Sequence, residues 1–333
     1  MDLDVAVPDW ARQVVSDLTD MHRRPHPVDP SRVRRFRLGL PDDVYFEYGF
    51  LDDAGRMRAD PANPARADNP WYPELSMARG PDYAPHPLAA PPEQAATGRL
   101  RRLRIEDDEG EGRRVTVYEP AGAAGPLPLA LVHDGTAYRR VARLPAVLQT
   151  LIDAGRARPA RLAFVDPSRP DRREAEYGFG ARYLSFARRT LIPRLRDEAD
   201  AEGGLLLMGA SLGALASTVL AMEDPDAVAG LALQSAAFLG APDERDFHAG
   251  RRSWARETLD ADDRELPWRV YQEVGRLDWL LDVNRAVATR FAERAEAHRY
   301  VERSAGHNWT FWRDGAAAAL EHLLPPRAVS STA

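Results

Sequence analysis

The feature that most constrains this chain is the pentapeptide Gly-Ala-Ser-Leu-Gly at residues 209–213. The apolar run Leu-Leu-Leu-Met at 205–208 precedes it, and a helix-like stretch at 214–222 follows it. A serine on such a tight strand-to-helix turn has its hydroxyl pushed out at the carboxyl end of a sheet, and small residues must flank it because the backbone is crowded there. The free N–H groups of the following helix would point at the same place, where an oxyanion could be held. A chance match in an Ala- and Gly-rich chain is the alternative, but the strand–helix context favours Ser211 as a nucleophile.

The composition excludes several kinds of site. The 333 residues include no cysteine, which removes disulfides, thiolate zinc sites and a cysteine nucleophile. All 45 cationic side chains are arginine, so a lysine Schiff base and a Ser–Lys dyad are also excluded. A net charge of −6 argues against nucleic acid or an anionic membrane as the main partner. The acidic start and the lack of an apolar run of about 18 residues argue against a secretory signal and a membrane span, so we expect a cytoplasmic protein with a small-molecule partner.

The first part of the chain has the patterns of a small separate domain. Residues 9–22 fit a short amphipathic helix, whose apolar face would contain Trp10, Val14, Leu18 and Met21. Residues 31–88 alternate in the manner of short strands, with a hairpin turn expected at 53–55. We therefore expect an N-terminal helix followed by a small immunoglobulin-like β-sandwich.

A stretch at 89–97 with two consecutive prolines is the expected linker. We place the N-terminal domain and linker at residues 1–95, a second domain at 96–326 and a flexible tail at 327–333. In the second domain we expect strands at 100–105, 115–118, 126–132, 161–165, 205–208, 229–233, 268–274 and 299–303, and helices at 144–154, 183–195, 214–222, 284–297 and 315–324. This alternation predicts an α/β fold with a doubly wound, mostly parallel sheet.

A serine nucleophile needs a general base and a third group that orients the base. In α/β-hydrolases, where this elbow is typical, an acid and then a histidine follow the serine, each in a loop beyond a strand. His307 is the only downstream histidine in a strand-to-helix loop, and the other candidates are His248, His298 and His322. Asp278, just after the strand at 268–274, is the predicted acid, with Asp282 as the alternative. A capping or core histidine is the other explanation for His307.

The oxyanion hole should combine the amide of Leu212 with an amide from the loop after an early strand. The sequence His-Asp-Gly-Thr at 133–136 ends such a strand, so we expect the amide of Gly135 or Thr136 to contribute. A tight turn that needs glycine for positive φ is compatible with this role. We expect a buried Asp134 to fix the loop through backbone N–H groups rather than to take part in chemistry.

Several of these segments occur in an order that is similar to a known family. They are Leu-Val-His-Asp-Gly at 131–135, the elbow at 209–213, Gln-Ser at 234–235 and Gly-His-Asn-Trp at 306–309 followed by Trp-Arg at 312–313. With them the chain resembles the putative esterase family of α/β-hydrolases, and within it the enterochelin (ferric enterobactin) esterases. Those enzymes are similar in having an N-terminal β-sandwich with a Tyr-rich strand and an Asp-Pro-x-Asn-Pro stretch, here at 60–64. The resemblance implies ester hydrolysis with Ser211 as nucleophile, His307 as base and an acid at or near Asp278. The family often has an aspartate after the histidine, where this chain has Asn308.

The resemblance also suggests residues that bind substrate. Arg173 and Glu176 match the family's Arg-x-x-Glu pattern, and an arginine there could hold an acidic or catecholate substrate. An Arg–Glu pair that orders the loop explains the pattern equally well. Trp309 is a candidate wall of an aromatic pocket, together with Trp254, Trp279 and Trp312, and core packing is the alternative for all four.

We therefore expect a serine-dependent carboxylic ester hydrolase that needs no metal or organic cofactor. By resemblance, the substrate is the trilactone of an iron-siderophore. A carbohydrate acyl ester or a simple carboxylic ester is an alternative, and a non-catalytic binding protein with a hydrolase fold is another. The sequence leaves open the oligomeric state and whether water or another alcohol accepts the acyl group.

Overall fold

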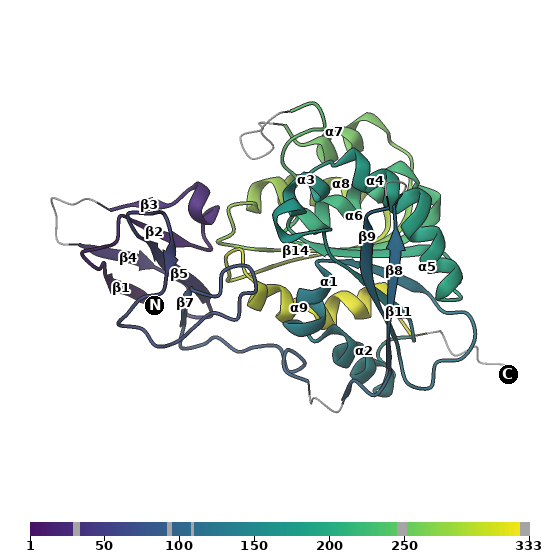
Figure 1. The fold of residues 1–333 in the computed structure, drawn as a ribbon, viewed down its shortest axis with the longest axis horizontal. Coiled ribbons are helices and arrows are strands. Elements are labelled where there is room, and N and C mark those ends of the chain that lie inside the picture. Colours follow the sequence, from purple (N-terminus) through teal and green to yellow (C-terminus); the bar gives the residue numbers. More distant parts are fainter. Residues whose placement is uncertain (29–33, 92–94, 108–109, 245–251, 327–333) are drawn as a thin grey trace.

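The computed structural model describes residues 1–28, 34–91, 95–107, 110–244 and 252–326. His248 and the expected tail at 327–333 lie outside these residues. The chain forms a small domain of antiparallel sheets beside a larger α/β domain (Figure 1). Within the described part of the chain, no helix has the length and apolar character that a membrane span would need. The boundary that we placed after residue 95 stays a prediction.

The N-terminal domain consists of two antiparallel sheets that share an apolar core. One sheet pairs β1 (Asp2–Ala6) with β4 (Arg35–Gly39). The other contains β3 (His26–Pro27), β2 (Gln13–Ser16), β5 (Tyr45–Leu51), β6 (Met57–Arg58) and β7 (Ser76–Arg79). The turn between β5 and β6 contains Gly55 at φ +70°, which confirms the expected hairpin.

The prediction of a helix at residues 9–22 is wrong. The segment forms β2 and then a short 3-10 turn at Met21–Arg23. Val14 and Val15 are both buried, but Val14 packs in the cluster with Phe46 and Val15 in a different cluster with Leu75. Burial of adjacent side chains on opposite faces is the period-two pattern of a strand, and pairing with β5 satisfies its backbone.

The larger domain is built on an eight-stranded sheet of order β15-β14-β13-β12-β10-β11-β9-β8. Its strands are β8 (Arg99–Glu106), β9 (Gly112–Glu119), β10 (Leu129–His133), β11 (Arg161–Val165), β12 (Leu205–Ala210), β13 (Val228–Gln234), β14 (Leu266–Gly275) and β15 (Ala295–Arg303). β8 and β9 are antiparallel, and β10 to β15 run parallel to one another. The predicted α/β-hydrolase sheet, doubly wound and mostly parallel, is confirmed.

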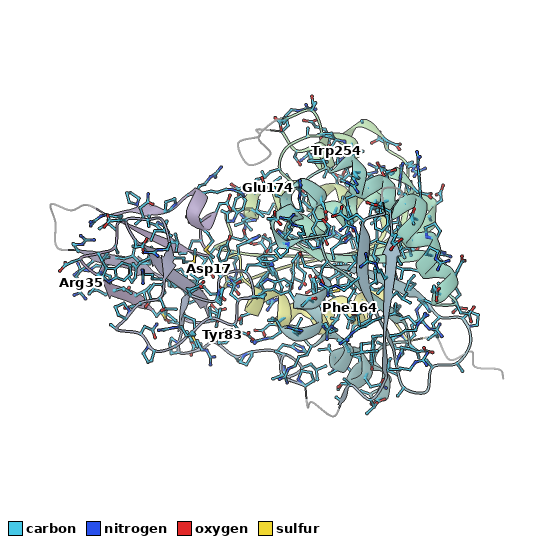
Figure 2. The ribbon with its side chains drawn as sticks, in the orientation of Figure 1. Asp17, Arg35, Tyr83, Phe164, Glu174 and Trp254 are labelled. Carbon is cyan, nitrogen blue, oxygen red and sulfur yellow. The ribbon has the colours of Figure 1, made fainter. Side chains whose placement is uncertain are left out.

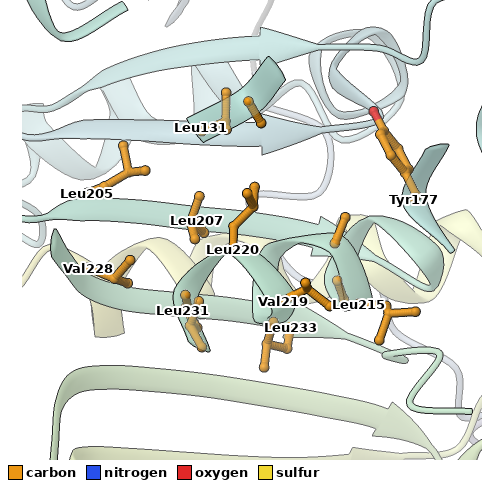
Figure 3. Packing of buried hydrophobic residues seen from close by; sticks show 14 of the residues in the cluster. Leu131, Tyr177, Leu205, Leu207, Leu215, Val219, Leu220, Val228, Leu231 and Leu233 are labelled. Atoms are coloured by element: carbon orange, nitrogen blue, oxygen red, sulfur yellow. The ribbon is translucent and has the colours of Figure 1, made fainter. Parts of the chain in front are cut away.

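Helices cover both faces of this sheet (Figure 1). They are α1 (Gly135–Arg140), α2 (Leu144–Asp153), α3 (Arg173–Tyr177), α4 (Ala181–Phe186), α5 (Ile192–Glu198), α6 (Leu212–Glu223), α7 (Trp254–Ala261), α8 (Leu281–Arg294) and α9 (Trp309–Leu323). A π-helical segment, Ala187–Leu191, joins α4 to α5. On one face, leucines of β10, β12 and β13 pack against α6 (Figure 3). On the other face α1, α2 and α9 bury a second cluster, so the sheet is apolar on both sides as a parallel sheet requires.

Candidate active site

Ser211 lies on a strained turn between β12 and α6. Its backbone has φ +55° and ψ −120°, a conformation that costs a non-glycine residue on the order of 1–3 kcal/mol. The Ser211 N–H donates to the carbonyl of Gln234 at 2.9 Å, and the Ser211 carbonyl accepts from the N–H of Ala237 at 3.1 Å. A Cβ on Gly209 would lie 2.7 Å from the nitrogen of Ala214, so the strand and helix approach too closely for a side chain there. The sequence therefore folds into the elbow that its spacing predicts.

His307 and Asp278 form a hydrogen-bonded pair in the loops after two neighbouring strands. The distance from His307 Nδ1 to Asp278 Oδ2 is 2.9 Å. The other carboxylate oxygen of Asp278 accepts from the N–H of Leu280 at 2.9 Å, and the carboxylate is fully buried. Asp282, the alternative acid, lies in the first turn of α8 with an exposed side chain. An Nδ1–H donor to Asp278 leaves His307 Nε2 as an acceptor, which is the tautomer that a general base needs.

Two tryptophans fix the plane of the His307 ring. The ring of Trp312 meets it edge-on, with centroids 4.9 Å apart at 88°, and that of Trp279 lies at 5.7 Å. Trp312 Nε1 donates to Ser235 Oγ at 3.0 Å. Ser235 has φ +45° and follows Gln234, the residue whose carbonyl holds Ser211. The histidine and the elbow are therefore tied to the same short segment after β13.

Parallel strands bring the three candidate groups to one edge of the sheet. Ser211 follows β12, Asp278 follows β14 by a short turn, and His307 lies in the loop after β15. Because these strands run in the same direction, their carboxyl ends face the same side. This arrangement is suited to acyl transfer through a serine, with the histidine moving the proton.

The two loops that would form an oxyanion hole lie side by side. Leu212 and Gly135 are the first residues of α6 and α1, where N–H groups have no acceptor within the helix. A Cβ on Gly213 would be 3.0 Å from the Cβ of His133, which shows how close the start of α6 is to the end of β10. The amide of Thr136, by contrast, donates to Asp166 Oδ1 at 2.9 Å. Of the two expected amides of this loop, Gly135 is therefore the better placed to donate to a substrate.

Arg173 and Glu176 are engaged in separate ion pairs. Arg173 donates through Nε and Nη2 to both oxygens of Asp134, at 2.8 and 2.7 Å, and its Nη2 also lies 3.3 Å from the carbonyl of Ala210. Burial raises the pKa of Asp134, and the charge of Arg173 opposes that rise. Glu176 accepts from Arg113 at 2.8 Å. Arg173 thus fixes the loop after β10, as expected for Asp134, but through its guanidinium and not through backbone amides. Contact of Arg173 and Glu176 with substrate stays a prediction.

Trp309 is part of the core, which corrects its expected place in the pocket wall. It is 0 % exposed, and its ring centroid lies 5.1 to 5.2 Å from those of Trp71, Tyr138 and Trp312. A side chain with no exposed surface does not reach a ligand in this structure. Of the two tryptophans beside His307, Trp312 is buried and Trp279 is partly exposed.

Sequence reasoning missed a contribution from the N-terminal domain. The His307 N–H donates to the carbonyl of Asp17 at 2.7 Å, and Asn308 Nδ2 donates to Asp17 Oδ2 at 2.6 Å. Asn308 Oδ1 also accepts from the N–H of Phe311 at 2.8 Å and so caps α9. No local signal marks Asp17, because its partners lie about 290 residues away in sequence. Among the residues that the structure describes, no group of three or more His, Asp or Glu side chains is placed to hold a metal ion.

Comparisons with known proteins agree with this fold. The ferric enterobactin esterase of Salmonella typhimurium is similar with a TM-score of 0.74 and 18% identity, over 97% of this chain and 92% of that one. The enterobactin esterase of Shigella flexneri, crystallised in the presence of 2,3-di-hydroxy-N-benzoyl-glycine, has a TM-score of 0.71 at 18% identity, over 97% and 92%. A ferulic acid esterase has a TM-score of 0.53 at 15% identity, over 68% of this chain and 98% of that one. No curated protein matches the chain. At these sequence identities, the structural likeness shows the fold alone. The family is shown by a separate comparison, in which residues 109–323 match the family model described as "Putative esterase". The chain belongs to that family of ester hydrolases.

Proposed function

We propose that the chain is a serine esterase in which Ser211 attacks the ester carbonyl. The observation that carries this proposal is the hydrogen bond between His307 and the buried Asp278, at the sheet edge where Ser211 occupies the elbow. His307 Nε2 takes the proton of the Ser211 hydroxyl as the bond to the carbonyl carbon forms. Asp278 keeps the ring in the required tautomer and stabilises the imidazolium.

The rest of the cycle uses the same groups. The oxyanion of the tetrahedral intermediate accepts hydrogen bonds from the amides of Leu212 and Gly135. Protonated His307 then gives its proton to the leaving alkoxide, and the acyl group remains on Ser211. A water molecule, deprotonated by His307, releases the acid and restores the serine. These steps need no metal or organic cofactor.

The substrate that we propose is a siderophore trilactone or a related catechol ester. The enterobactin esterases are matched over 97% of this chain, which includes its N-terminal domain, whereas the ferulic acid esterase is matched over 68%. The shared N-terminal domain therefore supports an enterobactin-like substrate. Feruloyl or other acyl-sugar esters are the second candidate, since the ferulic acid esterase shares the α/β fold.

Activity on p-nitrophenyl acetate and labelling by a fluorophosphonate test the nucleophile. In Ser211→Ala we expect labelling to vanish and kcat to fall by at least about 10⁴-fold. Ser185→Ala, in α4, is the matched control and should keep both. A panel of siderophore and feruloyl esters then ranks kcat/KM between the two substrate classes. Wild-type protein that neither turns over nor labels would support the binding-protein alternative.

The acid is tested by a pair of conservative variants. Asp278→Asn keeps the size of the side chain but favours the wrong tautomer of His307, so we expect kcat to fall by about 10³- to 10⁴-fold with little change in KM. Asp282→Asn should retain the wild-type kcat. The reverse result would assign the acid to Asp282.

A further inference from the structure

The loop that carries His307 is held from outside its own domain. Ala305 forms a parallel β-bridge with Tyr45 of β5, and the His307 N–H donates to the carbonyl of Asp17, just after β2. A Cβ on Gly306 would lie 2.7 Å from both the carbonyl carbon and the Cγ of Asp17. Asp17 lies on the side of the N-terminal domain that faces the α/β domain (Figure 2). Three consecutive residues, 305–307, therefore contact the N-terminal domain through their backbone.

The Asp17 side chain adds a fourth contact. Its carboxyl is fully buried, and Oδ2 accepts from Asn308 while no hydrogen bond to Oδ1 exists among the described residues. Burial, with the nearby Glu47 carboxyl, raises the pKa of Asp17 well above its usual value. The charge of Asp278 contributes to the same rise in the pKa of Asp17.

Among the described residues, the α/β domain holds the loop through the His307 side chain, which bonds to Asp278, and through backbone and capping contacts at its two ends. At one end the Leu277 N–H donates to the carbonyl of Ala305 at 3.0 Å, and at the other end Asn308 caps α9. Between them, the His307 N–H finds its acceptor in Asp17. A shift of about 1 Å in a catalytic group can lower a rate by about 100-fold, so this contact is in a position to control catalysis.

We propose that Asp17 is a positioning residue for the reaction, and that the N-terminal domain thereby contributes to the geometry of the catalytic centre. Through its carbonyl and its carboxyl, Asp17 sets the position of residues 306–308 so that the His307 ring meets Asp278. This inference rests on the proposed role of His307 as general base. It goes further, because it assigns to the N-terminal domain an effect on kcat that is separate from substrate binding.

Three variants test the inference in the full-length chain. Gly306→Ala inserts a methyl group between Asp17 and the histidine loop, and we expect kcat for p-nitrophenyl acetate to fall by about 100-fold with KM within about twofold. Asp17→Ala should lower kcat by about tenfold. Asp17→Asn keeps a side-chain oxygen that can accept from Asn308 Nδ2 and should restore kcat to within about threefold of wild type.

The matched control is Gly39→Ala in β4. Its added Cβ would find its nearest neighbour, Asp2 Oδ1, at 4.0 Å, so kcat should not change. All rates are measured well below the Tm of each variant, and fluorophosphonate labelling rates should follow kcat. If Gly306→Ala does not fold, the pair Asp17→Ala and Asp17→Asn decides.

Two failures are distinguishable. If Asp17→Ala and a folded Gly306→Ala lower Tm but keep kcat within twofold, the contact only holds the domains together and the inference is overturned. If Ser211→Ala keeps the wild-type rate, the proposed function itself is wrong. If a folded Gly306→Ala lowers kcat but Asp17→Ala keeps it within twofold, the role of the carboxyl is overturned and only that of the carbonyl remains.

Discussion

Ser211 combines a reactive side chain with an unfavourable backbone. Its φ of +55° is one that glycine adopts freely, whereas both serine and alanine have a Cβ that opposes it. We expect Ser211→Gly and Ser211→Ala to be equally inactive, but Ser211→Gly to be more stable by about 1 kcal/mol. The measurement is urea unfolding of both variants under identical conditions. A less stable Ser211→Gly would mean that the elbow is not strained in solution.

Glu47 makes the stability depend on pH. The residue is fully buried in β5, where Asn69 donates to its Oε2 at 2.7 Å, and burial raises its pKa to about 7. The unfolded chain ionises this carboxyl near pH 4.5, so between pH 4.5 and 7 only the folded state keeps the proton. The resulting stability is complete below pH 4.5 and is lost as the pH rises towards 7, by about 3 kcal/mol.

The test is urea unfolding of wild type and Glu47→Gln at pH 5 and pH 8. The variant should lose less stability than wild type between these values, because it has no proton to release. Glu74→Gln, at an exposed position of the same domain, is the control and should keep the wild-type pH dependence. An unchanged dependence in Glu47→Gln would show that this carboxyl does not carry the effect.

At the scale of elements, continuous apolar runs were the most reliable signal. The buried strands β10, β11 and β13 lie within about three residues of their predicted ranges, since a parallel strand packed on both faces must be apolar throughout. The short helices α1 and α3 were not predicted, because five or six residues cannot show a helical period. The helix expected at 183–195 exists, but a π-helical segment, Ala187–Leu191, interrupts it. Pro193 follows two residues later, and its nitrogen has no hydrogen to donate to a backbone carbonyl of the preceding turn.

Arg173 connects three of these elements. From α3 it binds Asp134, after β10, and the carbonyl of Ala210, at the end of β12. Removing the guanidinium would leave a buried carboxylate without its cation, so Arg173→Met should lower the free energy of unfolding by about 3 kcal/mol. The exposed neighbour Arg172→Met should have little effect.

The same variant separates the two explanations of the Arg-x-x-Glu pattern. If Arg173 only orders the loop, Arg173→Met with Asp134→Asn should recover part of the stability, and KM should shift equally for neutral and acidic esters. If it also binds substrate, KM should rise for acidic or catechol esters but not for p-nitrophenyl acetate. Full stability in the single variant would contradict the structural role.

At the scale of the whole molecule, sequence reasoning placed the sheet and the order of the candidate groups but not the contacts between domains. Ser211, Asp278 and His307 could be chosen as candidates because each follows a strand in a fixed order along the chain. Asp17 and Trp71 were not, because a cross-domain contact has no period or spacing in the sequence. Their positions follow only from how the two domains pack.

Trp71 is another contact between the domains. Its ring meets those of Trp309 and Trp312 edge-on at 5.1 and 5.3 Å, and the guanidinium of Arg173 lies 4.3 Å from its centroid. Together with Asp17, it joins the N-terminal domain to both the histidine loop and the elbow. Apolar contact of this kind couples the unfolding of two domains, since neither can open without exposing the other.

We therefore expect the wild-type chain to unfold in a single calorimetric transition, and Trp71→Ala to split it into two. The matched control is Trp10→Ala, because Trp10 packs on Phe50 and Arg58 within the N-terminal domain. That variant should lower Tm without splitting the transition. Two transitions in the wild type would mean that the domains are energetically independent. A single transition in Trp71→Ala would place the coupling in other contacts, such as the histidine loop or the hydrogen bond from Tyr83 to Asp314. Because Asp17 contacts that loop, the Asp17→Ala variant in the same calorimeter then decides whether it carries the coupling.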